Sequence, residues 1–134
     1  MNIKIEDNYC SEEVLKDLKK IFADNYFPWY YHENKTTQPD DGLYQFVHVL
    51  YEINVPTSNW YPSVAKVLES RNPIYVRIKV NLQPDINRGA QSGFHNDMAL
   101  YPGHTTSILY MNTNNGYTIF EESGQKIESV ENRL

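Results

Sequence analysis

The sequence is poor in several features that would point to particular classes of protein. Its only cysteine is Cys10, so no disulfide can form within the chain, and a reducing cytoplasm is the expected compartment. No apolar run approaches the length that spans a membrane, and residues 1–6 lack the apolar segment of a secretory signal. The formal net charge is −5 and basic residues do not cluster, which argues against nucleic acid or a membrane surface as partner.

The composition is that of a globular protein. Hydrophobic residues make up 40% of the chain and charged residues 22%, a balance that disordered chains do not have. A chain of 134 residues can bury a core of its own, and we find no linker-like stretch within it. We therefore expect a single domain over residues 1–134.

Two helices are predicted in the N-terminal half. Ser11 precedes two glutamates, which is typical of a helix N-cap, and apolar residues then recur at three- and four-residue spacing as far as Phe22. A second helix is expected over 58–70, with Pro62 tolerated in its first turn. Strands are expected at Ile3 and Ile5 and over 26–31, 44–53 and 74–80.

After residue 97 the pattern favours strands alone. Segments 105–112 and 117–121 flank Asn114, Asn115 and Gly116, a strong hairpin signal, and a further turn at 122–125 precedes a strand from 126. Helices followed by short strands predict an α+β fold with a double-stranded β-helix, or jelly-roll, core and the N-terminal helices packed on one sheet. Residues 1–73 would supply helices and supporting strands, and 74–134 the first part of the core.

His95 and Asp97 are the candidate chemical pair. A strand is expected over 93–98, and because side chains two residues apart on a strand point to the same side, the imidazole and the carboxylate would lie next to each other there. These are two of the three ligands of a 2-His-1-carboxylate site for Fe(II). Alternatively, the two are hydrogen-bonded neighbours at a strand end. His48, within the predicted strand 44–53, is interpreted as a packed or hydrogen-bonded core histidine.

The order of several segments resembles a known enzyme family. Arg77-Ile78-Lys79-Val80-Asn81-Leu82 is followed by Phe94-His95-Asn96-Asp97, by Thr106-Ser107-Ile108-Leu109-Tyr110-Met111-Asn112, by Asn114-Asn115-Gly116-Tyr117-Thr118-Ile119-Phe120 and by Ser129-Val130-Glu131-Asn132-Arg133-Leu134. This order resembles the 2-oxoglutarate- and Fe(II)-dependent dioxygenases, in the prolyl-4-hydroxylase-like branch common in marine bacteria and their phages. The resemblance implies an oxygenase that uses Fe(II), 2-oxoglutarate and, as a further candidate cofactor, ascorbate. Its substrate would be a peptide, with proline as one target, or a small molecule.

The resemblance also implies roles for individual residues. His95 and Asp97 would be iron ligands. Tyr110 would hydrogen-bond the distal carboxylate of 2-oxoglutarate, and Ile108, with the same facing, would line its methylene chain. A core tyrosine with a satisfied hydroxyl is the alternative for Tyr110.

The family's third ligand, a distal histidine, and its 2-oxoglutarate-anchoring arginine or lysine have no counterpart here. After Asp97 the only histidine is His104, too close in sequence to complete the triad, and neither Lys126 nor Arg133 is placed like the anchor. We therefore expect a C-terminally truncated chain with an incomplete barrel, whose open sheet edge would favour a homodimer. Whether it is an active enzyme is left open. A non-catalytic jelly-roll binding module, a cupin-type metal enzyme and a structural or virion component remain alternatives.

Overall fold

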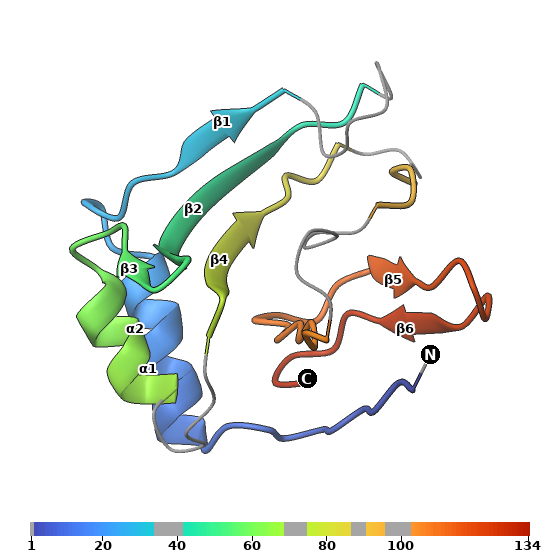
Figure 1. Ribbon diagram of the computed structural model, residues 1–134, viewed down its shortest axis with the longest axis horizontal. Coiled ribbons are helices and arrows are strands. Elements are labelled where there is room, and N and C mark those ends of the chain that lie inside the picture. The colour runs from blue at the N-terminus through green and yellow to red at the C-terminus, as the bar shows by residue number, and fades with distance from the viewer. Residues whose placement is uncertain (1, 34–41, 69–74, 87–90, 96–102) are drawn as a thin grey trace. The chain divides into compact units, whose positions relative to one another are not determined.

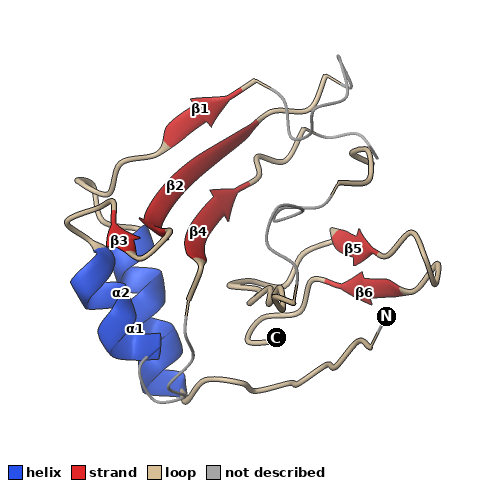
Figure 2. Cartoon of the chain, in the orientation of Figure 1, coloured by secondary structure: helices blue, strands red, loops and turns tan. Residues whose placement is uncertain are grey.

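The computed structural model describes residues 2–33, 42–68, 75–86, 91–95 and 103–134. Over these residues the chain forms two α-helices and six short strands, coloured from blue to red along the chain in Figure 1. In chain order they are α1 (Glu12–Phe22), β1 (Tyr30–His32), β2 (Gln45–Glu52), β3 (Val55–Pro56), α2 (Tyr61–Leu68), β4 (Arg77–Leu82), β5 (Tyr117–Ile119) and β6 (Lys126–Glu128). All strand pairs are antiparallel, so the chain is α+β as predicted (Figure 2).

The chain divides into two compact units. One consists of residues 20–93, and the other combines residues 1–19 with residues 94–134. Neither α1 nor α2, the helices of the described part of the chain, has the length and apolar character needed to cross a membrane. The single domain and the jelly-roll core stay predictions.

Strand β2 is the centre of the sheet in the unit of residues 20–93. It pairs with β1 on one edge and with β4 on the other, and β3 folds back on its end. The turn from β2 to β3 has two residues, Ile53 and Asn54, both at positive φ, which is the backbone shape of the tightest hairpins. The strand predicted over 44–53 is thereby confirmed almost to its ends, because alternating aromatic and β-branched residues suit a central strand.

Aromatic rings join the helices to this sheet. The ring of Phe27, a buried residue, lies 4.6 Å from His48 on β2 and 5.5 Å from Trp60, just before α2. Tyr51 of β2 stacks on Tyr61 of α2 at 5.0 Å. Helix α2 therefore packs against β2, with Pro62 in its first turn where no intrahelical donor is lost.

In the other unit the two ends of the chain are joined. The backbones of Glu6 and Leu134 exchange two hydrogen bonds of 2.9 and 3.0 Å. The strand expected at Ile3 and Ile5 is not formed, and the N-terminal segment meets the C-terminal segment farther along, through the backbones of Glu6 and Tyr9. The helix predicted after Ser11 is confirmed, and the Ser11 Oγ accepts the backbone N–H of Val14 at 3.3 Å.

The strand predicted over 105–112 is wrong for this structure. Strand β5 pairs with β6 through the turn at 120–125, where Gly124 has a φ of +67°, and not with the chain before Asn114. Asn114 instead accepts the N–H of Gly116 with its own side chain at 2.7 Å, which closes a local Asx-type turn. The turn predicted at 122–125 therefore forms the hairpin, while residues 114–116 form a turn without paired strands on both sides.

Candidate functional site

The predicted metal-binding pair falls at an edge of the described structure. The side chain of His95 is exposed, and residues 91–95 do not form a strand, so the described part of the expected strand at 93–98 is absent. Asp97 lies outside the described residues. Among the residues that are described, no three His, Cys, Asp or Glu side chains gather into a group able to hold a metal ion. The iron-ligand roles of His95 and Asp97 stay predictions.

Tyr110 is held at its backbone and at its hydroxyl. Its N–H donates to the carbonyl of Arg133 at 2.9 Å, and its own carbonyl accepts the N–H of Asn132 at 2.8 Å. Its hydroxyl donates to the Oγ1 of Thr118 on β5 at 2.6 Å, and both side chains are half-buried. The extended segment that carries Tyr110 is therefore fixed to the C-terminal segment and touches β5 by side chain only. Ile108, two residues earlier, is 44% exposed.

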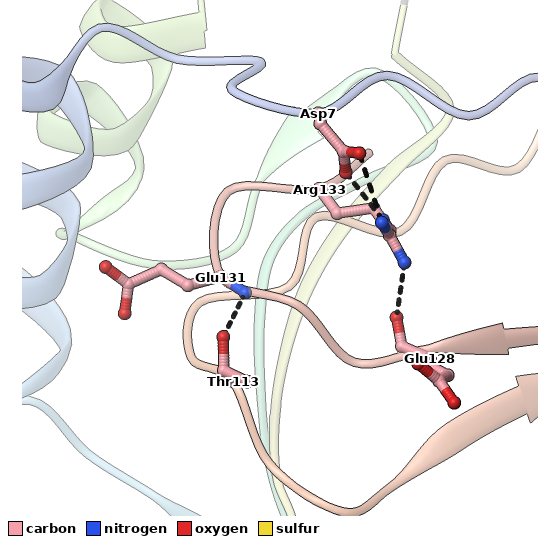
Figure 3. A network of polar contacts seen from close by, with 5 residues as sticks. All are labelled: Asp7, Thr113, Glu128, Glu131 and Arg133. Atoms are coloured by element: carbon pink, nitrogen blue, oxygen red, sulfur yellow. Dashed lines mark hydrogen bonds and ion pairs between the residues drawn. The ribbon is translucent and has the colours of Figure 1, made fainter.

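A charged pair lies beside this arrangement. Arg133 donates to both carboxylate oxygens of Asp7, at 2.6 and 3.1 Å, and also to the carbonyl of Glu128 at 3.4 Å (Figure 3). The hydrogen bond from Arg133 lowers the pKa of Asp7, and Asp7 raises that of Arg133. The fork of the guanidinium matches a carboxylate in two bonds, which ties residue 7 to the chain end. Arg133 is thus committed to a partner within the protein.

A neighbouring contact ties the C-terminal segment to residue 113. The N–H of Glu131 donates to the Oγ1 of Thr113 at 2.9 Å (Figure 3). Farther along, Ser129 donates its hydroxyl to the carbonyl of Asn112 at 3.1 Å. The segment before β5 and the segment after β6 therefore run together without forming a sheet.

Asn132 makes the most complete contact between the two ends of the chain. Its amide donates to the carbonyl of Cys10 and accepts the N–H of Cys10, each at 2.8 Å. Asn132 is 7% exposed and has a φ of 62°, a conformation that asparagine tolerates better than most residues. Sequence reasoning missed this contact, because a single asparagine before an arginine carries no signal for a partner 122 residues away.

His48 is a core histidine, as predicted. It is 4% exposed, lies between the rings of Phe27 and Tyr30, and hydrogen-bonds the backbone of Pro28. Its Nδ1 is buried without a hydrogen-bond partner. Burial lowers the pKa of His48, and the bond to Pro28 only partly opposes this. The neutral ring therefore fits its surroundings, and an unpaired Nδ1 lone pair is the result.

A shallow polar cavity of about 180 Å³ lies on the unit that contains Tyr110. It is lined by residues 113–116 and 128–130 together with Lys126, and neither Tyr110 nor Thr118 contributes to it. The ammonium of Lys126 sits 4.0 Å from the centre of the Tyr117 ring, an attractive cation–π contact. Lys126 is therefore engaged at the hairpin.

Comparison of the chain with protein-family models, curated proteins and solved structures finds no match. The function must therefore be inferred from the residues themselves and from the order of the segments noted above. Thr118 is the residue of this site that sequence reasoning missed. The hairpin predicted about residues 114–116 would have brought positions 110 and 118 near each other, but it is not formed, and β5 pairs with β6 instead.

Proposed function

We propose that this chain belongs to a 2-oxoglutarate- and Fe(II)-dependent oxygenase that hydroxylates a peptidyl or small-molecule substrate in a reducing compartment. Its core would be a jelly roll to which residues 74–134 contribute. His95 and Asp97 would hold the iron, Tyr110 would bind the distal carboxylate of 2-oxoglutarate, and Ile108 would line its methylene chain.

The observation that carries the proposal is the setting of Tyr110. A tyrosine that binds a carboxylate must be rigid at its backbone and must keep a hydroxyl that can turn toward a ligand. Tyr110 is fixed through both backbone groups to residues 132 and 133, and its only described side-chain bond is to another hydroxyl, that of Thr118. Because hydroxyls rotate and can either donate or accept, this bond can rearrange without moving the backbone.

The donor set fits the metal. An imidazole and a carboxylate are ligands that Fe(II) accepts, and a site with open positions suits a co-substrate and dioxygen. His95, an exposed residue, would supply the imidazole. When bound, the iron supplies the oxygen chemistry, while the chain supplies ligands, orientation and a pocket that excludes water. The apolar side chain of Ile108, 44% exposed, is suited to the methylene groups of a dicarboxylate.

The test is turnover of 2-oxoglutarate by the full-length product of the reading frame. The protein is prepared without oxygen, loaded with Fe(II), mixed with 2-oxoglutarate and exposed to air, and succinate is measured. We expect succinate from the unaltered protein and none above the metal-free background from Asp97→Ala, because the iron loses a ligand. Asp17→Ala, which removes an exposed carboxylate from α1, is the matched control and should behave as the unaltered protein.

Two results would contradict the proposal. One is undiminished succinate formation by Asp97→Ala. The other is the absence of both succinate formation and Fe(II) binding in the unaltered, folded protein. A binding module would give the second result together with a normal unfolding transition.

A further inference from the structure

We infer that Thr118 is a positioning residue for the Tyr110 hydroxyl, and that it controls whether this hydroxyl can receive a carboxylate. The inference rests on the proposed function, in which Tyr110 binds 2-oxoglutarate. Beyond that function, it assigns a role to a second hydroxyl, that of Thr118 on β5.

Two independently anchored elements hold the pair. Tyr110 is fixed by backbone bonds to residues 132 and 133. Thr118 is the middle residue of β5 and pairs with Ile127 of β6, which is buried. The 2.6 Å separation of the two oxygens therefore does not depend on either side chain alone. It is near the short end of the range for a hydroxyl–hydroxyl bond.

The direction of this bond matters for an anion. When the Tyr110 proton lies toward Thr118, the tyrosine oxygen offers only lone pairs to anything else. A carboxylate placed there would be repelled. For Tyr110 to donate to a carboxylate, its proton must turn outward, and Thr118 must then donate its own proton to the tyrosine oxygen.

Thr118 can either accept a hydrogen bond from Tyr110 or donate one to it, because a hydroxyl is both a donor and an acceptor. Without a ligand it can accept the Tyr110 proton, which keeps the half-buried tyrosine hydroxyl hydrogen-bonded. With a carboxylate bound it becomes the donor in a chain that runs from Thr118 to Tyr110 to the anion, in which each bond strengthens the next. The exchange needs rotation of two protons and no movement of heavy atoms.

Nearby charge does not replace this contact. Arg133 lies close enough for Tyr110 to affect its pKa, but its guanidinium is paired with Asp7. The guanidinium of Arg133 is therefore engaged, and the hydroxyl pair is the group that we assign to a carboxylate at this position. Losing the polarising donor should weaken carboxylate binding about fivefold to tenfold, the value of one hydrogen bond.

The test uses the full-length protein with Thr118→Val, which keeps the shape and removes the hydroxyl, and Thr118→Ser, which restores it. Affinity for 2-oxoglutarate is measured by calorimetry without oxygen in the presence of Fe(II), and KM and kcat for 2-oxoglutarate by succinate formation. We expect Thr118→Val to raise Kd and KM about fivefold to tenfold with kcat within about twofold. Thr118→Ser should match the unaltered protein, and urea unfolding checks that each variant is folded.

A double-mutant cycle with Tyr110→Phe shows whether Thr118 acts through Tyr110. If it does, Thr118→Val has no further effect on the Kd once the tyrosine hydroxyl is gone. Should Thr118→Val fail to fold, Thr118→Ala and Thr118→Ser make the same comparison.

The outcomes separate the inference from the proposed function. If Tyr110→Phe weakens binding of 2-oxoglutarate and Thr118→Val leaves it equal or tighter, the inference is wrong and the proposed function stands. The inference is also overturned if Thr118→Val weakens binding by the same factor in the Tyr110→Phe background. If the unaltered protein neither binds nor consumes 2-oxoglutarate, the proposed function itself fails.

Discussion

Replacement of Asn132 separates two contributions to the stability of this fold. The buried amide makes two hydrogen bonds of 2.8 Å with the backbone of Cys10, and residue 132 has a φ of 62°. Asn132→Gly removes both hydrogen bonds, but glycine adopts a positive φ without steric strain. Asn132→Ala removes the same bonds and also places a Cβ in a conformation that disfavours it.

The expected losses follow from these differences. Two hydrogen bonds contribute about 2 kcal/mol together, and glycine gains roughly 0.7 kcal/mol of unfolded-chain entropy. Asn132→Gly should therefore lower the free energy of unfolding by roughly 2.5 to 3 kcal/mol. Asn132→Ala also loses the two hydrogen bonds, about 2 kcal/mol, but it has no glycine entropy term. Instead, the alanine Cβ in the left-handed region costs about 1 to 2 kcal/mol, so Asn132→Ala should lower the free energy of unfolding by roughly 3 to 4 kcal/mol.

Asn8 provides a matched control. It has a φ of 56° and an exposed side chain, so its replacement changes the backbone contribution without the loss of a buried amide. Asn8→Gly should lower the free energy of unfolding by less than about 1 kcal/mol. Urea denaturation measures all of these values, and the rate at which a disulfide reagent labels Cys10 gives a local reading. That rate should rise in both Asn132 variants and should not rise in Asn8→Gly.

Two results would contradict this account of Asn132. If Asn132→Gly and Asn8→Gly cause losses within about 0.5 kcal/mol of each other, the hydrogen bonds to Cys10 do not stabilise the fold. If Asn132→Ala is as stable as Asn132→Gly, the positive φ is not a constraint in solution.

Two further predictions concern the unit of residues 20–93. Leu50 is fully buried on β2, so Leu50→Ala should lower the free energy of unfolding by about 2 to 5 kcal/mol. Leu82 is 44% exposed, and Leu82→Ala should lower it by less than about 1 kcal/mol in the same urea assay. Equal losses in the two variants would contradict the assigned core. For His48, burial lowers the pKa in the folded state, so the unfolded chain binds the proton first as the pH falls below about 6.5. The contribution of His48 to the free energy of unfolding is therefore complete above that pH, and it decreases below that pH until the folded pKa is reached. The stability difference between the unaltered protein and His48→Phe should therefore change between about pH 7 and pH 5. A difference that does not vary with pH would refute the buried neutral ring.

Elements with local signals were predictable from the sequence. Helix α1 follows from the Ser11 cap and the spacing of its apolar residues, and β2 from an alternation that suits a central strand. The position of Pro62 in the first turn of α2 follows from the donor that proline lacks. In each case the deciding physics lies within a few residues of the chain.

Pairing between distant segments was not predictable in the same way. Residues 105–112 have the composition of a strand, but composition shows only that the chain is extended and not which segment it meets. Tyr110 bonds to residues 132 and 133, and β5 takes β6 as its partner. A strand needs a ladder of bonds, and a single meeting point does not make one. The same holds for Ile3 and Ile5, which precede the separate backbone bonds that Glu6 makes to Leu134 and Tyr9 makes to Asn132.

In the candidate site too, local features were predictable from the sequence and contacts between distant segments were not. The two-residue spacing of His95 and Asp97 is visible in sequence, and its role stays a prediction. The order of segments pointed to the hydroxyl of Tyr110 as a candidate binding group, but the sequence did not indicate the hydrogen-bond partner of that hydroxyl. Its partner depends on how β5 is held by β6, a contact of the folded chain.

Tyr110 is where the stability of the fold and the proposed chemistry meet. The Asn132 and Arg133 backbone groups that hold it belong to the segment fixed by Cys10 and Asp7, so loosening that segment should also loosen the tyrosine. Asn132→Gly would then weaken 2-oxoglutarate binding without touching a ligand-binding group, whereas Thr118→Val would weaken it without loosening Cys10. Measuring Cys10 labelling and 2-oxoglutarate affinity in both variants distinguishes a site disturbed through its frame from one disturbed through its hydrogen bond.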